Sequence, residues 1–99
     1  MALDKLSVIW SAEAVADLKS IYYYLLTRNS PETALKIRNE IFNAPQSIVF
    51  PEQFQPDEYL ADYRRIVVRN YKILYTIQGT TIYIISIFNS YSHPSKMKR

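Results

Sequence analysis

The sequence predicts an α+β domain in which one strand is followed by a helical hairpin and then by a three-stranded antiparallel meander. Two patterns support this prediction. Apolar residues recur every three or four positions between residues 12 and 48, as in helices that bury one face, and they alternate with polar residues on either side of that stretch. The chain has 99 residues, so these elements must share one core, and we expect a single domain over residues 1–99.

The first half of the chain contains the signals for one strand and two helices. Residues Lys5–Trp10 alternate between apolar and polar and predict a short strand. Ser11 is a suitable N-cap for a helix that runs from residue 12 to about residue 28. Ser30 and Pro31 then supply the cap and the first position of a second helix. Because the link between the helices is short, we expect them to pack as an antiparallel hairpin.

The second half contains a loop followed by the meander. Prolines and acidic residues mark a loop over residues 49–61, and Pro45 before it either kinks or ends the second helix. Tight turns are expected at Asn70, because asparagine tolerates a positive φ, and at Gly79. No periodicity follows the last strand, and residues 90–99 are expected to form a flexible tail. The three meander strands are expected over residues 62–68, 71–77 and 81–88. The third is apolar on both faces, as a central strand would be.

The composition excludes several kinds of site. The chain has no cysteine and one histidine, so neither a disulfide framework nor a metal site of thiolates or clustered histidines is expected. Its single glycine, Gly79, excludes glycine-rich phosphate-binding loops, and no cofactor is expected. No apolar run approaches the roughly 20 residues needed to span a membrane, and the opening MALDKLSVIW lacks a signal-peptide pattern. The sequence therefore predicts a soluble cytoplasmic protein.

Charge is distributed unevenly along the chain. Residues 1–61 carry five basic and eight acidic side chains, a net charge of −3, whereas residues 62–99 carry seven basic side chains and one acidic side chain, a net charge of +6. A basic half on a small domain is typical of proteins that bind a polyanionic or acidic partner. The alternative is that these side chains only solvate one face of the sheet and a tail.

Three segments carry a family resemblance: VIWSAEAVADLKSIYYYL at residues 8–25, DYRRIVVRNYKILYTI at residues 62–77 and IYIISIF at residues 82–88. Together they resemble the RelE/ParE superfamily, the toxins of bacterial type II toxin–antitoxin systems. The resemblance covers nearly the whole chain and agrees with the order of elements derived above. It implies a compact toxin that an antitoxin neutralises by wrapping a C-terminal segment around the toxin surface. RelE-like members cleave mRNA in the ribosomal A site, and ParE-like members poison DNA gyrase.

A RelE-like activity would imply a set of site residues in this chain. Lys72 falls where the ribonucleases usually place an arginine, and Arg64 and Arg65 lie on the preceding strand, on opposite faces. Only one of these arginines can share the face of Lys72. Tyr91 and His93 fall in the tail region where RelE-like enzymes keep a catalytic tyrosine or histidine. Such enzymes need a base, an acid and cations that hold the phosphate, and they use no metal.

The sequence of the tail favours the ParE-like activity, which is the poisoning of DNA gyrase. Residues 89–94, NSYSHP, more closely resemble a tail found in ParE-like members, which have no catalytic set to carry over. The resemblance therefore slightly favours a gyrase-directed toxin over a ribosome-dependent mRNA endonuclease, and a non-toxic member that only binds an antitoxin is a third hypothesis. In every case the expected partner is an antitoxin with an amphipathic, acidic binding segment. A homodimer and a toxin–antitoxin hetero-oligomer are both left open.

Overall fold

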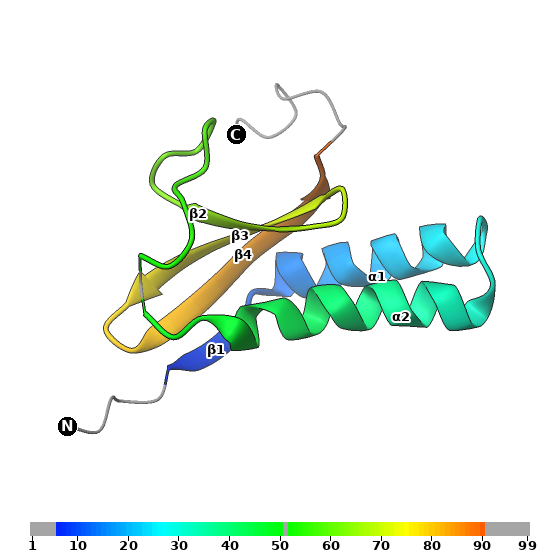
Figure 1. The fold of residues 1–99 in the computed structure, drawn as a ribbon, viewed down its shortest axis with the longest axis horizontal. Coiled ribbons are helices and arrows are strands. Elements are labelled where there is room, and N and C mark those ends of the chain that lie inside the picture. The colour runs from blue at the N-terminus through cyan, green and yellow to red at the C-terminus, as the bar shows by residue number, and fades with distance from the viewer. Residues whose placement is uncertain (1–5, 51, 91–99) are drawn as a thin grey trace.

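The protein folds into two layers, a four-stranded sheet and a hairpin of two helices that covers one face of it (Figure 1). The computed structural model describes residues 6–50 and 52–90. The elements, in chain order, are β1 (Ser7–Trp10), α1 (Ala12–Leu26), α2 (Pro31–Asn43), the 3₁₀ turn η1 (Ala44–Ser47), β2 (Arg64–Val68), β3 (Tyr71–Gln78) and β4 (Thr81–Asn89). The predicted order of one strand, two helices and a three-stranded meander is confirmed.

The strands lie in the sheet in the order β1-β4-β3-β2. β2, β3 and β4 pair antiparallel as the predicted meander, and β1 pairs parallel with β4. β4 is therefore an inner strand, which explains why its sequence is apolar on both faces. The position of β1 was not predicted, because the strand with which it pairs lies near the other end of the chain.

Both helices begin at the predicted serine caps. Ser11 Oγ accepts a hydrogen bond from the Ala14 N–H at 3.0 Å, and Ser30 Oγ accepts one from the Thr33 N–H at 3.2 Å. Each bond satisfies an N–H group that has no partner within the helix. α1 ends at Leu26, slightly before the end predicted near residue 28.

Pro45 ends the second helix and does not kink it. α2 stops at Asn43, and Pro45 lies in η1, the 3₁₀ turn that follows. Proline lacks the backbone N–H that a continued α-helix would need at this position. Ile48, which the periodicity assigned to the helix, follows η1 and is still buried in the core.

The core lies between the hairpin and the inner face of the sheet. From the sheet it contains Ile66, Tyr71, Ile73, Tyr75, Ile82, Ile84 and Ile87. From the two helices it contains Ala14, Leu18, Leu25, Ala34, Ile37 and Ile41. Full burial of one large apolar side chain is worth about 1.5–3 kcal/mol, so this interface is the main source of stability. The outer face of the sheet has no helix over it, and its contacts come from loops.

A bulge in β4 is held by the first turns of α1. The register between β3 and β4 shifts after Leu74, so that Ile85 has no partner residue on β3. Ser11 Oγ donates a hydrogen bond to the Ile85 carbonyl at 2.8 Å, and Asp17 Oδ2 accepts one from the Ile87 N–H at 3.0 Å. The irregular backbone of β4 therefore keeps its hydrogen bonds through side chains of α1.

The tight turn between β2 and β3 has its positive φ at Arg69, at 55°, so the prediction that Asn70 would take it is wrong. The Arg69 guanidinium donates two hydrogen bonds to the Glu40 carboxylate of α2, at 2.7 and 3.0 Å. Arg69 is the first of the two turn residues, as Gly79 is in the β3–β4 turn, so both hairpins take the positive φ at the same turn position. In the β3–β4 turn, Gly79 has a φ of 61°, as expected.

Candidate functional site: a strap over the basic strands

The pairing of β2 with β3 places the predicted cations on two faces of the sheet. Arg64 pairs with Tyr75 of the core, so the next residue, Arg65, points to the outer face. Lys72 pairs with Val67, which shares the face of Arg65. Arg65 is therefore the arginine that lies on the same face as Lys72, and that face is the one the helices leave uncovered.

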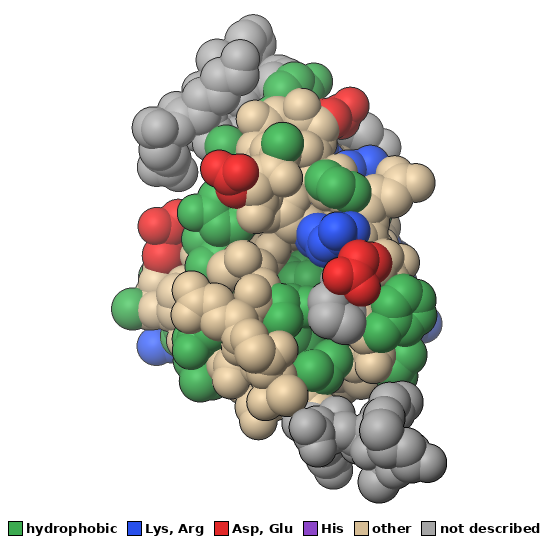
Figure 2. All heavy atoms as spheres, turned by 90° about the vertical axis from the view of Figure 1, so that its left-hand side faces the viewer, with side chains coloured by type: hydrophobic (Ala, Val, Ile, Leu, Met, Phe, Trp, Pro, Cys, Tyr) green, Lys and Arg blue, Asp and Glu red, His purple; other side chains and the backbone are tan. Residues whose placement is uncertain are grey.

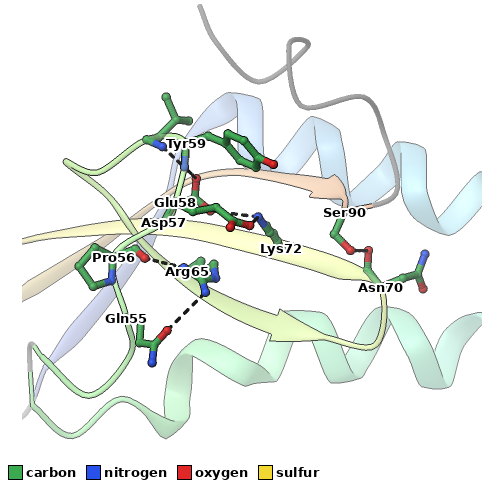
Figure 3. Close-up of polar contacts among 10 residues, drawn as sticks. Gln55, Pro56, Asp57, Glu58, Tyr59, Arg65, Asn70, Lys72 and Ser90 are labelled. Carbon is green, nitrogen blue, oxygen red and sulfur yellow. Dashed lines mark hydrogen bonds and ion pairs between the residues drawn. The ribbon is translucent and has the colours of Figure 1, made fainter.

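The loop between η1 and β2, whose residues 54–60 we call the strap, runs along the edge of β2, where Pro56 forms a β-bridge with Arg64, and then reaches the outer face at Lys72 (Figure 3). All three cations bind it. Arg64 Nη1 donates a hydrogen bond to the Phe54 carbonyl at 2.6 Å, and Arg65 Nη1 donates one to the Pro56 carbonyl. Lys72 binds the carboxylates in the middle of the strap. The residues that were predicted to hold a phosphate therefore hold a segment of the same chain.

Lys72 lies beneath the strap, with 7% of its surface exposed. Its Nζ atom is 3.3 Å from Asp57 Oδ1 and 3.4 Å from Glu58 Oε1. The same ammonium lies 5.2 Å from the centre of the Tyr59 ring, within the range of a cation–π contact. Figure 3 shows these three strap residues around the end of the lysine side chain. A phosphate arriving from solvent would have to displace them to reach Lys72.

The buried side chain of Asp57 holds the backbone of the strap in place. Only 2% of the residue is exposed, and its Oδ2 atom accepts hydrogen bonds from the backbone N–H groups of Tyr59 and Leu60, each at 3.0 Å. Burial alone would raise the pKa of this carboxyl group. The two backbone donors and the Lys72 ammonium outweigh burial, and together they hold the pKa of Asp57 below its usual value.

Acid is therefore expected to weaken the fold through Asp57. A carboxyl group with a lowered folded-state pKa stabilises the fold fully above its unfolded pKa, and this contribution is lost as the pH falls through the lower folded pKa. Urea unfolding from about pH 6 to about pH 2 should show a loss of stability that Asp57→Asn reduces. An equally large loss in Asp57→Asn would contradict this assignment.

The two predicted tail residues, Tyr91 and His93, lie outside the described residues. Ser90, where the described chain ends, is tied to the β2–β3 turn (Figure 3). Its N–H and its Oγ both donate to the Asn70 carbonyl, at 2.6 and 2.8 Å. The described chain therefore ends beside Asn70, which lies two residues before Lys72 in the sequence.

Internal contacts engage the four described basic side chains of the meander, and carboxylates neutralise two of them, Lys72 and Arg69. Arg64, Arg65 and Lys72 bind the strap, and Arg69 binds Glu40. On the face drawn in Figure 2, basic side chains are few and scattered, and acidic side chains lie among them. The basic side chains described between residues 62 and 90 therefore do not make a continuous basic surface on that face.

The carboxylates of the strap were not identified as site residues from the sequence. The available signal was Pro56-Asp57-Glu58, since aspartate after proline often caps its own turn. Within residues 6–50 and 52–90, no group of three or more His, Cys, Asp or Glu side chains is placed to hold a metal ion. Over the same residues, no helix has the length and apolar character needed to cross a membrane.

Comparisons with known proteins agree on one family. The model of the family described as "ParE toxin of type II toxin-antitoxin system, parDE" matches residues 8–90. A chain of the solved chromosomal ParDE toxin–antitoxin system from P. aeruginosa is similar in structure, with a TM-score of 0.73 and 26% sequence identity. That match covers 85% of this chain and 95% of the other. No curated protein matches the sequence at a significant level.

Proposed function

Because the chain belongs to the ParE family of toxins of type II toxin–antitoxin systems, we propose that it stops growth in the cytoplasm by binding DNA gyrase and that a ParD-type antitoxin neutralises it. One observation supports gyrase, and not the ribosome, as the target. Metal-independent RNA cleavage needs accessible cations around the phosphate, together with an acid and a base. Lys72 is covered by the strap, and Arg64 and Arg65 donate to its carbonyl groups. These contacts favour a binding protein over a nuclease.

The partner follows from the same family membership. The solved relative comes from a ParDE system, and we propose that this chain likewise pairs with an antitoxin of the ParD type. The binding segment of that antitoxin is expected to be amphipathic and acidic. On the outer face, Arg65 is more available to it than Lys72, because Arg65 is half-buried and Lys72 is buried.

A ribosome-dependent mRNA endonuclease is the second candidate. Arg65 and Lys72 share the outer face, and Ser90, which precedes the tail that carries Tyr91 and His93, is bound to Asn70 near the same strands. If the strap were displaced on the ribosome, these four side chains would supply the cations and the acid–base groups that cleavage needs.

A direct comparison of the two targets tests the proposal. The purified protein should inhibit supercoiling by gyrase and accumulate cleaved DNA, and it should leave mRNA on programmed ribosomes intact. In cells that express it without an antitoxin, incorporation of labelled thymidine should fall before incorporation of labelled methionine. Cleavage of ribosome-bound mRNA, with methionine incorporation falling first, would refute the gyrase proposal.

The Lys72→Met variant distinguishes inhibition of gyrase from cleavage of RNA. Methionine fills the covered position without charge, and Asp57 loses its ammonium partner but keeps its two backbone donors. The variant should therefore be less stable than wild type, and its folded fraction should inhibit gyrase within a few-fold of wild type. A nuclease that used Lys72 would lose roughly 100-fold or more of its activity. Lys36→Met, at an exposed position on α2, is the matched control. Tyr91→Phe and His93→Gln should likewise leave gyrase inhibition unchanged.

A further inference from the structure

The two edges of the sheet are protected to different extents. β1 and β2 are the outer strands, on opposite sides of the sheet (Figure 1). The strap covers part of the edge of β2, where the Arg65 N–H donates to the Gln55 carbonyl at 3.1 Å. β2 also carries two arginines, Arg64 and Arg65, and charged side chains on an edge strand disfavour pairing with another chain. β1 is short, but its sequence SVIW contains no charged residue and no proline, so it is the less protected edge.

The outer edge of β1 presents the backbone N–H and C=O groups of Val8 and Trp10. The N–H groups of Ser7 and Ser11 donate to carbonyl groups of β4 and of the residue before it, at 3.0 and 2.9 Å. Because backbone groups alternate in direction along a strand, those of Val8 and Trp10 face away from β4. Within residues 6–50 and 52–90, no hydrogen bond reaches them. This edge can therefore pair with a further strand.

A second copy of β1 fits this edge. If two copies pair antiparallel about a two-fold axis at Ile9, the N–H and C=O groups of Val8 bond those of Trp10 in the other copy. The Ile9 side chains, each 49% exposed in the single chain, then cover one another on the outer face. On the inner face Val8 lies opposite Trp10, and pairs of β-branched and aromatic side chains are favourable across strands. The edge is therefore complementary to itself, as a two-fold interface requires.

An extended segment of the antitoxin is the competing occupant. It would satisfy the same backbone groups, but an acidic segment finds no cation on β1. Arg65, the half-buried cation of the outer face, lies on β2, at the opposite edge of the sheet. The charges of the two edges therefore favour the antitoxin near β2 and an uncharged strand at β1.

We propose that the toxin forms a homodimer in which β1 pairs antiparallel with β1 of a second copy, so that two four-stranded sheets join into one continuous sheet. The strap and the basic strands of each copy then lie toward the two ends of the combined sheet. The proposal does not depend on gyrase as the target, because it concerns the assembly of the toxin alone.

Cross-linking through position 9 tests the geometry. The chain has no cysteine, so Ile9→Cys introduces the only thiol. Residues that face each other in such an antiparallel pair have Cα atoms about 4.5 Å apart, within the range of about 4.4–6.8 Å that a disulfide spans. Mild oxidation should therefore convert most of the purified variant into a covalent dimer. Leu35→Cys, at a side chain that is 48% exposed on α2, is the matched control and should stay largely uncrosslinked.

Proline substitutions on the two edges test the role of the backbone. Val8→Pro removes an outward N–H group and no hydrogen bond to β4, so it should leave the circular dichroism spectrum unchanged. It should raise the dissociation constant of the dimer by roughly tenfold or more, as measured by sedimentation equilibrium. Val67→Pro makes the same change on β2, where the Val67 N–H, like that of Arg65 two residues before it, faces away from β3. This control should dimerise as the wild type does.

Three results would overturn the proposal. The first is a wild-type protein that sediments as a monomer at every concentration, including one in which Val8→Pro instead weakens binding of the antitoxin. The second is a dimer that Ile9→Cys does not cross-link. The third is a dimer that Val67→Pro weakens as much as Val8→Pro does. Should Val8→Pro fail to fold, Ile9→Lys, which places like charges side by side at the two-fold axis, must give the same loss of the dimer.

Discussion

Asp57→Ala is expected to lower the free energy of unfolding by about 3–5 kcal/mol, which is typical of removing one partner from a buried ion pair. The variant leaves the Lys72 ammonium buried with Glu58 as its remaining carboxylate partner among the described residues, and the Glu58 side chain is 63% exposed. The backbone N–H groups of Tyr59 and Leu60 also lose their acceptor. Urea unfolding at neutral pH, followed by circular dichroism, measures the change.

Two further variants test whether the loss of stability comes from the buried ion pair between Asp57 and Lys72. Asp62→Ala removes an exposed carboxylate from the same loop and should change stability by no more than about 0.5 kcal/mol. Adding Lys72→Met to Asp57→Ala removes the unpaired charge and should restore much of the lost stability, because an apolar side chain is tolerated in a covered position. Equal effects of Asp57→Ala and Asp62→Ala would mean that the strap contributes little to the fold.

Local periodicity made the helices and the meander predictable. The serine caps and the alternation in β2 and β3 are properties of neighbouring residues, and they fixed the helix starts and the opposite faces of Arg64 and Arg65. The parallel pairing of β1 with β4 and the bulge at Ile85 depend on contacts between distant parts of the chain, which no local pattern encodes. The positive φ falls on Arg69 and not on Asn70 because Arg69 is the first of the two turn residues, and the identity of the residues did not indicate which of the two would take it.

From the sequence, the candidate site could be predicted only as a group of charged side chains. Counting charges along the sequence treats each basic side chain as available, whereas Lys72 forms its ion pairs with carboxylates in a loop that has no periodicity. The strap therefore changes how the same residues are interpreted. A cluster that suggests phosphate binding in the sequence is, in the folded chain, a structural network that holds a loop over β2 and β3.

Trp10→Ala is expected to lower the free energy of unfolding and to release β1 from the sheet. Trp10 packs against the core from the edge strand β1, and its ring stacks on Phe42 of α2, with the ring centres 5.5 Å apart. Losing this side chain should cost about 3 kcal/mol, and β1, with only four residues, should detach from β4 first. The backbone N–H groups of β1 should therefore lose protection from hydrogen exchange under conditions in which α1 and α2 remain folded.

Phe42→Ala separates the packing of Trp10 from its stacking. This variant removes the partner ring, which is 39% exposed, and leaves Trp10 against the core, so it should cost only about 1 kcal/mol and preserve gyrase inhibition. Circular dichroism must be the probe, since Trp10 is the only tryptophan. Hydrogen exchange should show that Trp10→Ala loses protection in β1 while α1 and α2 stay protected. An equal loss of protection in all three elements would mean that Trp10 supports the whole core and not only the edge strand.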